Sequence, residues 1–356
     1  MKVFSMLLRV VLLAGAVLIA DSANGQDQSI RPLQVNPGPG SVQIIPGSLS
    51  YKAFGLAGSR TRAPELRPVR SIAAAQSFAV SEASISVISS PGFYAGDVTN
   101  PGDGPAIVTA EFHPVYVNRE PSHWGNVSRF LTDLGASEFI HVLDQYTGST
   151  TNNRYTLGGS FSAHYPIPED THTLLTDDIL NLVHAAAELG GNGYGHLYHV
   201  FLPKGVDMCI PATTTSPLEC YSPDVPANWY FCAFHSSVTF SDSVGHVLFS
   251  VEPYQDVSGC SVPPHGSANN QLTDSTNNVL SHETSEAISD PDGDAWWVQN
   301  FTFANGNEIG DECTRFEVLT SGATYWDYGS VELNGHLYTF QPEYSNAVHG
   351  CTYSPD

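Results

Sequence analysis

The stretch LTDSTNNVLSHETSEAIS, residues 272–289, decides the fold. It predicts an α-helix, because Thr273 or Asp274 near its start can cap the first turn and Asp290, with the proline after it, ends the segment. A second helix is predicted at residues 177–189, where acidic residues begin the segment and apolar residues recur every three or four positions. These two helices are the framework for the rest of the prediction.

The longer helix carries an unusual set of polar side chains. His282 and Glu286 are four residues apart, so they lie on one face, one turn apart, where both can bind the same metal ion. Glu283 lies one step round the helix, where it would take a proton from a metal-bound water and pass it to a leaving amine. This is the H-E-x-x-H geometry of zinc peptidases with Glu in place of the second His. The alternative is a helix face exposed to solvent, on which neighbouring residues satisfy the hydrogen bonds of His282.

A third metal ligand is predicted from an acidic cluster downstream. Glu308 lies 26 residues after His282 and is followed by Asp311. A Glu on the element after the helix, with an Asp one turn later, is how the gluzincin class of zinc peptidases completes its site. We therefore expect Glu308 to be the third ligand and Asp311 to orient a ligand from outside. The alternative ligands are Asp311, Asp290 and His235.

Zn²⁺ is the expected cofactor, because neutral imidazole and carboxylate groups both bind zinc. Two negative ligands make Zn²⁺ a poorer Lewis acid, so Ca²⁺ or another hard cation is the alternative. Asp290, Asp292 and Asp294, with Gly293 among them, resemble the start of a calcium loop. Position twelve of that loop would be Phe301 rather than Glu, which excludes an EF-hand and favours a turn that ends the helix.

The remaining sequence alternates short strand and helix patterns. Strands are predicted at residues 106–117, 194–202, 229–234 and 246–251, and short helices at 126–134 and 139–145. Glycine-rich and tyrosine-rich sequence of β character fills much of the rest. We therefore expect an α/β (α+β) protein with a zincin-like mixed β-sheet and an active-site helix, rich in loops and stapled by disulfides.

Six cysteines lie in the C-terminal half and form no C-x-x-C pair, which gives no support to a zinc ribbon or a thioredoxin motif. An even number of cysteines behind a signal peptide predicts three disulfides. Many pairings are open, and our hypothesis joins neighbours in the sequence: Cys209–Cys220, Cys232–Cys260 and Cys313–Cys351.

The N-terminal residues predict export. A basic start precedes an apolar run at residues 10–20, which is too short to span a bilayer and is followed by small residues. Residues 1–25 are therefore expected to be a signal peptide, and the protein to be extracellular, periplasmic or wall-associated. Residues 26–75, basic and rich in proline with a net charge of +4, predict a linker or a pro-segment. Residues 76–356, with a net charge of −28, predict a single metallopeptidase-like domain without a membrane span.

The composition limits the partners. Thirteen Lys and Arg against 36 Asp and Glu exclude a general nucleic-acid binder, because phosphate contacts need basic side chains. The chain is 41% hydrophobic, which is enough to bury a core. Its 16 tyrosines and five tryptophans leave a cell-wall polysaccharide as a candidate partner.

The run SHETSEAISDPDGDAWW at residues 281–297, followed by EIGDEC at 308–313, resembles the phosphate-induced, exordium-like family of plants and its bacterial relatives. The family pattern is close to H-E-x-x-E-x-x-(T/S)-(N/D)-P, then an aromatic pair, then E-I-(A/G)-D-x-C. Several plant members lack the His and Glu of the helix, which this sequence keeps. The resemblance implies a secreted or wall-associated protein with these functional positions: His282, Glu283, Glu286, Glu308 and Asp311.

The sequence thus predicts a secreted metal-dependent peptidase, of the zinc type, that acts on a peptide or protein substrate. The alternative is a non-catalytic extracellular protein of the exordium-like type, with a binding or signalling role and a structural metal or none. A third hypothesis is a disulfide-stapled carbohydrate-binding protein of the cell wall.

Overall fold

A computed structural model describes residues 96–210, 219–225, 229, 231–257, 260–262, 267–298, 308–313 and 329–355, with the backbone of residues 31–32 and 42–43. The predicted signal peptide lies outside the described residues, as does the predicted linker or pro-segment apart from those two backbone segments. No helix in the described part of the chain is long and apolar enough to cross a membrane.

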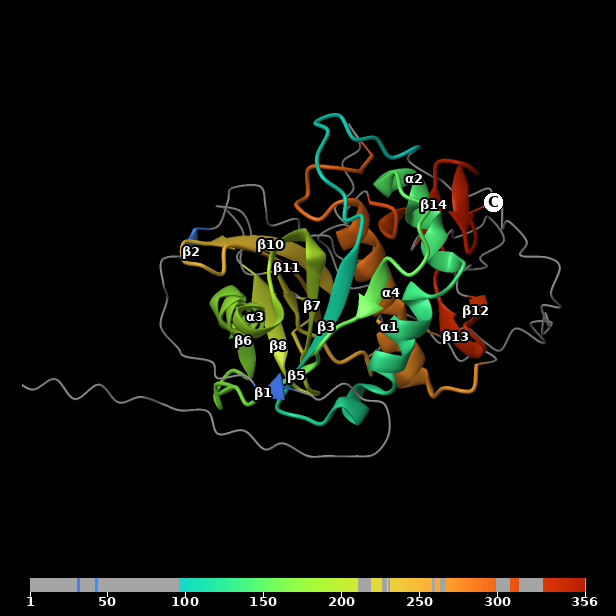
Figure 1. Cartoon of the computed structure of the whole chain (residues 1–356). Coiled ribbons are helices and arrows are strands. Elements are labelled where there is room, and N and C mark those ends of the chain that lie inside the picture. The colour runs from blue at the N-terminus through green and yellow to red at the C-terminus, as the bar shows by residue number, and fades with distance from the viewer. Residues whose placement is uncertain are drawn as a thin grey trace, which may run out of the picture.

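Eight described strands form a mixed β-sheet (Figure 1). Their order is β1-β5-β3-β7-β11-β10-β2, with β4 paired to β3. The pairs from β1 to β11 are parallel, whereas β10 is antiparallel to β11 and to β2. The structure therefore confirms a mixed α/β protein. The strands are β1 (Arg31–Pro32), β2 (Val42–Gln43), β3 (Ala110–Val117), β4 (Tyr155–Leu157), β5 (Phe161–Ala163), β7 (His196–Phe201), β10 (Phe234–Phe240) and β11 (His246–Glu252).

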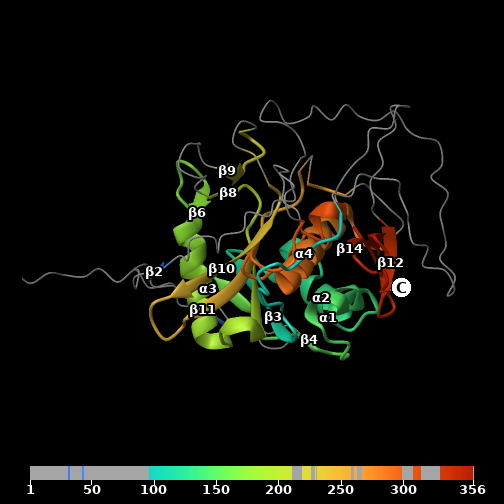
Figure 2. The same ribbon diagram turned by 90° about the horizontal axis from the view of Figure 1, so that it is seen from above.

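The two predicted long helices are present and cover opposite faces of this sheet (Figure 2). Helix α3 (Thr176–Gly190) packs on β3, β7 and β11, and helix α4 (Gln271–Ser289) packs on β10 and β11. Alternate residues of a strand point to opposite faces. Accordingly Val115 joins the apolar core under α3, whereas Phe112 and Tyr116 join the core that contains part of α4.

Helix α4 is buried along nearly its whole length, although most of its residues are polar. The residues from Thr273 to Ser289 are all buried, because β10 and β11 contact the helix on one side, and α1 (Val127–Gly135) and β13 (His336–Phe340) contact it elsewhere. The side chain of Asn270 caps the helix by accepting a hydrogen bond from the Thr273 N–H at 2.9 Å. The helix ends at Ser289, and Asp290 follows it as the C-cap, as predicted. A polar helix buried in this way needs polar partners for its side chains.

Smaller elements surround this framework. The helices are η1 (Pro121–Trp124), α1 (Val127–Gly135), η2 (Phe139–Leu143), α2 (Asp144–Thr147), η3 (Gly193–Gly195) and η4 (Asp311–Cys313). The smaller sheets contain β6 (Thr173–Leu175), β8 (Asp207–Ile210), β9 (Glu219–Tyr221), β12 (Gly329–Leu333), β13 (His336–Phe340), β14 (Glu343–Ser345) and β15 (Gly350–Thr352).

All three predicted disulfides are confirmed. Cys209–Cys220 joins β8 to β9, and Cys232–Cys260 anchors the chain that leads into β10. Cys313–Cys351 joins η4 to β15 and therefore tethers the turn that carries Glu308 and Asp311. Disulfides of this kind are typical of exported proteins.

One predicted strand is displaced. The prediction placed it at residues 229–234, but β10 begins at Phe234 and ends at Phe240. Trp229 forms only an isolated bridge with Cys220. The prediction failed because β10 buries polar side chains, among them Ser236 and Ser237, which do not produce an apolar strand pattern.

Candidate functional site

The polar face predicted for the long helix is present on α4. His282, Glu283 and Glu286 are fully buried. The Nε2 atom of His282 lies 3.3 Å from Oε1 of Glu286 and 4.0 Å from Oε1 of Glu283. Because residues four apart share a helix face, the imidazole and the Glu286 carboxylate meet directly.

The sheet contributes a second imidazole. His235 lies in β10 and is fully buried. Its Nε2 atom is 3.6 Å from Oε2 of Glu286 and 3.1 Å from Oε2 of Glu308. Glu286 therefore lies between two imidazoles, with Oε1 toward His282 and Oε2 toward His235. The sequence predicts His235 only as an alternative ligand, and the fold places its imidazole beside Glu286 and Glu308.

The turn at residues 308–313 closes the cluster from a third side. The backbone N–H of Asp311 donates to Oε1 of Glu286 at 3.0 Å, and the N–H of Glu308 lies 3.3 Å from Oδ2 of Asp311. A Cβ at Gly310 would lie 2.6 Å from Nδ1 of His282 and 3.0 Å from Oε1 of Glu286. Only glycine lets the backbone approach the imidazole so closely.

Among the described residues, two groups of potential metal ligands include residues of α4, and within each group the ligand atoms lie within 4.8 Å of one another. One group is His282, Glu286 and Asp311, and the other is His235, Glu283 and Glu286. Glu286 belongs to both. Asp311, whose Oδ1 is 3.8 Å from Nε2 of His282, is grouped with the helix residues, whereas Glu308 contacts His235. Glu308 as the third ligand stays a prediction.

Two further buried carboxylates were missed from the sequence. Glu252 ends β11 and Glu343 begins β14, and both are fully buried. Neither lies near the helix motif in the sequence, so no spacing pointed to them. Both carboxylate oxygens of Glu343, like those of Glu283, have no hydrogen-bond partner among the described residues. Oε1 of Glu252 accepts a hydrogen bond from the Ser250 hydroxyl at 2.7 Å.

These carboxylates are held away from water and close to one another. Burial raises the pKa of Glu252 to about 8. Burial is the largest cause that raises the pKa of Glu283 well above its usual range, and the negative charges of Glu286 and other neighbouring carboxylates raise it further. Burial and the charges of Glu286 and Asp311 raise the pKa of Glu343 in the same direction. The cluster therefore favours either protons or a bound cation.

No described Lys or Arg side chain supplies that positive charge. Arg154 pairs with Asp144, Lys204 pairs with Asp256, and Arg129 contacts Asn269 and Tyr338; Arg119, the fourth described basic residue, is exposed. We call this group of buried side chains the α4 cluster: His235 and His282 with the six buried acidic residues Glu252, Glu283, Glu286, Glu308, Asp311 and Glu343.

The acidic run after α4 forms a turn, as expected from its residues. Oδ1 of Asp290 accepts a hydrogen bond from the Ala295 N–H at 2.7 Å, which stabilises this turn. Asp292 lies 3.2 Å from Nε2 of His246 and accepts a hydrogen bond from the Tyr194 hydroxyl. Asp290 is buried but belongs to neither ligand group.

No protein-family model matches this sequence, and no curated protein or solved structure is significantly similar to it. The exordium-like resemblance rests on the residues quoted above. Function is therefore inferred from the side chains of the α4 cluster and their contacts.

Proposed function

We propose that the chain is a secreted metal-dependent hydrolase, a zinc peptidase, whose catalytic centre is the α4 cluster. The observation that carries the proposal is the set of four buried acidic residues within about 4 Å of the Nε2 atoms of His235 or His282, with two more buried carboxylates close enough to interact with them and no described Lys or Arg among them. Buried carboxylates are stable when they are protonated, paired or bound to a cation. Of these, binding of a divalent cation is the one that would also engage the two imidazoles as ligands.

The donor atoms fit a transition-metal cation. Ligand atoms around a tetrahedral Zn²⁺, with bonds of about 2.0–2.2 Å, lie about 3.4 Å apart. Nε2 of His282 is 3.3 Å from Glu286 and 3.8 Å from Asp311, which is close to that spacing. His282, Glu286 and Asp311 would therefore hold the ion, and Glu308 and His235 would complete or orient its ligands. Two imidazoles favour Zn²⁺ over Ca²⁺, since Ca²⁺ prefers oxygen ligands only.

Glu283 is the residue placed to move protons in this centre. A bound Zn²⁺ would supply Lewis acidity and lower the pKa of a water molecule bound to it. The Glu283 carboxylate lies beside the His282 imidazole and has no hydrogen-bond partner among the described residues. Its raised pKa makes it a stronger base than an exposed glutamate once it is ionised. We assign to it the transfer of a proton from water to the leaving amine.

The test combines metal removal with one conservative variant. Purified protein is treated with a chelator and assayed on casein and on a peptide library before and after addition of Zn²⁺. We expect cleavage to stop on chelation and to return with Zn²⁺. Glu283→Gln should retain the metal but cleave about 10²–10⁴-fold more slowly, the usual contribution of a general base. Glu188→Gln, an exposed change on α3, is the matched control.

Two results would contradict the proposal. Cleavage that continues at the same rate after complete metal removal would exclude a metal-dependent reaction. Cleavage by Glu283→Gln at the rate of Glu188→Gln would remove the assigned proton carrier.

The complete burial of the α4 cluster favours one second candidate. Structural zinc sites are closed, whereas catalytic sites keep a position open to substrate, and His282, Glu283 and Glu286 are all 0% exposed. In this case the protein is a non-catalytic extracellular binding protein of the exordium-like type, with a structural metal. Metal removal would then lower the melting temperature without any hydrolysis being detected. Retention on cell-wall polysaccharide resins, unchanged in Glu283→Gln, would support this candidate.

A further inference from the structure

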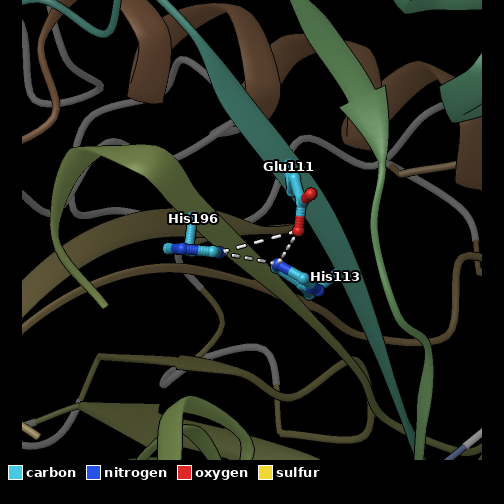
Figure 3. Close-up of side chains that lie close together, drawn as sticks. All are labelled: Glu111, His113 and His196. Carbon is cyan, nitrogen blue, oxygen red and sulfur yellow. Dashed lines mark hydrogen bonds and ion pairs between the residues drawn. The ribbon is translucent and has the colours of Figure 1, made fainter. Parts of the chain in front are cut away.

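A second group of metal-ligand side chains lies on the other face of the sheet, the face that α3 covers. Glu111 and His113 lie two residues apart on β3, and His196 begins β7, directly opposite Glu111 in the strand register. Figure 3 shows the three side chains pointing toward one another from these neighbouring strands. We call this the β3–β7 cluster.

The hydrogen bonds of His113 fix which of its nitrogens faces the cluster. Its Nδ1 atom lies 2.9 Å from the backbone carbonyl oxygen of Gly159 and therefore donates its hydrogen to that oxygen. In the neutral imidazole the lone pair is then on Nε2. Nε2 is 3.0 Å from Nδ1 of His196 and 3.6 Å from Oε2 of Glu111. A carbonyl that holds one imidazole nitrogen in this way is the usual outer partner of a metal-binding histidine.

The three donor atoms have the spacing that a small cation requires. The distances are 3.0 Å between the two imidazole nitrogens, and 3.6 Å and 3.9 Å from these nitrogens to Oε2 of Glu111. Ligand atoms around a tetrahedral Zn²⁺ lie about 3.4 Å apart. Shifts of a few tenths of an ångström bring all three atoms to that spacing. Two imidazoles and one carboxylate are a common ligand set for zinc with a fourth position open to water.

The surrounding residues are shaped to hold the imidazoles. A Cβ at Gly158 would overlap the His113 ring, and a Cβ at Gly191 would overlap the His196 ring. The Tyr198 ring stacks on His113 at a centroid distance of 4.9 Å and an interplanar angle of 20°. The position of His113 is therefore set by packing on both sides, which pre-organises the cluster before any ion binds.

Exposure distinguishes this cluster from the α4 cluster. The Glu111 side chain is 53% exposed and that of His196 is 25% exposed, whereas that of His113 is 2% exposed. An ion can therefore reach the β3–β7 cluster from solvent without any opening of the fold.

We propose that Glu111, His113 and His196 form a second, exchangeable site for Zn²⁺ or a similar divalent transition metal. His113 binds through Nε2, His196 through Nδ1 and Glu111 through Oε2, and water occupies the fourth position. The ion joins β3 to β7 and so adds stability in proportion to its concentration. This site is independent of the α4 cluster and holds whether or not that cluster is catalytic.

The experiment counts Zn²⁺ per chain by competition with a chromophoric chelator, using the purified full chain. His196→Ala and Glu111→Gln should each lose one Zn²⁺, or bind it at least tenfold more weakly. Glu286→Gln, which disables the α4 cluster, should keep this ion. The matched control is His184→Ala on α3, because its side chain is 26% exposed and contacts Asp242, and neither residue belongs to a group of three potential ligands among the described residues.

A His196→Ala protein that binds as many Zn²⁺ ions as His184→Ala, with the same affinity, overturns the proposal. If His196→Ala unfolds, Glu111→Gln decides, because its exposed side chain can be changed without altering the core. A second measurement follows the melting temperature of Glu286→Gln as Zn²⁺ is added. We expect it to rise, and to stay constant in Glu286→Gln combined with Glu111→Gln. A melting temperature of Glu286→Gln that does not change as Zn²⁺ is added would also contradict the second site.

Discussion

The α4 cluster and the β3–β7 cluster use the same donor groups on opposite faces of one sheet, but in different surroundings. The α4 cluster contains six buried acidic residues and two buried imidazoles, and none of these side chains is more than about 5% exposed. In the β3–β7 cluster one half-exposed carboxylate accompanies two imidazoles. Water screens the second cluster, whereas the first must obtain neutralising charge from protons or a cation. Burial therefore leads us to expect that the stability of the α4 cluster depends on pH and, if it binds a cation, on that cation.

The largest expected effect comes from Glu286→Gln. Glu286 lies between His282 and His235, so this change removes a negative ligand from both groups of the α4 cluster at once. We expect metal affinity at the α4 cluster to fall at least about 100-fold and hydrolysis to fall with it, while the β3–β7 cluster keeps its ion. Zinc counting and peptide cleavage measure the two effects. Hydrolysis at the wild-type rate would show that the α4 cluster is not the catalytic centre.

The second prediction concerns pH. In metal-free protein Glu252 keeps its proton up to a pKa of about 8, whereas its ordinary value is 4.5. Between these values the folded state binds more protons than the unfolded state. The free energy of unfolding therefore falls as pH rises, by about 1.4 kcal/mol per pH unit for each such carboxyl. Glu283 and Glu343 act in the same direction.

Denaturant titrations of chelator-treated protein at several pH values between about 5 and 8 check this slope. Glu252→Gln should reduce the slope, since it removes one titrating group, and Glu188→Gln should leave it unchanged. Added Zn²⁺ should weaken the dependence of the unfolding free energy on pH still further. Stability that rises with pH in metal-free protein would contradict the charge balance described for the α4 cluster.

A smaller effect is expected from Gly310→Ala. The new Cβ would lie 2.6 Å from Nδ1 of His282, so either the imidazole or the turn at residues 308–313 must move. We expect a loss of about 1–3 kcal/mol in the free energy of unfolding, together with weaker metal binding at the α4 cluster. Gly102→Ala is the control, because its nearest new contact is an ordinary 3.7 Å. Equal stability of the two variants would mean that the turn adapts freely.

The smallest effect is expected from Gly158→Ala on the other side of the sheet. A Cβ there would meet the His113 ring, so Zn²⁺ binding at the β3–β7 cluster should weaken by about tenfold, as for an outer-shell change. Hydrolysis should remain at the wild-type rate, because the α4 cluster lies on the opposite face. A loss of hydrolysis equal to that of Glu286→Gln would show that the two regions are coupled.

The sequence was informative where residues that act together are also close in the chain. His282 and Glu286 were predicted to lie together because a helix brings residues four apart onto one face, and Glu283 was included as the residue directly after His282. The disulfides also joined neighbouring cysteines, and all three pairings were predicted correctly.

The rest of the two clusters depends on strand pairing, which no local spacing reveals. Glu252 and Glu343 are single carboxylates at the end of one strand and the start of another, and each looks like an ordinary surface acid in the sequence. His196 meets His113 across 83 residues, through the register of β3 with β7. The strand β10, which carries His235, was displaced in the prediction because its buried residues are polar.

The most direct test of the central claim is anomalous diffraction at the zinc absorption edge from crystals of the full chain grown with Zn²⁺. We predict a peak bounded by Nε2 of His282 and the carboxylates of Glu286 and Asp311. A weaker peak at Glu111, His113 and His196 would mark the second site. A map without a peak at the α4 cluster, in crystals where those side chains are well ordered, would contradict the assignment of a metal centre to this protein.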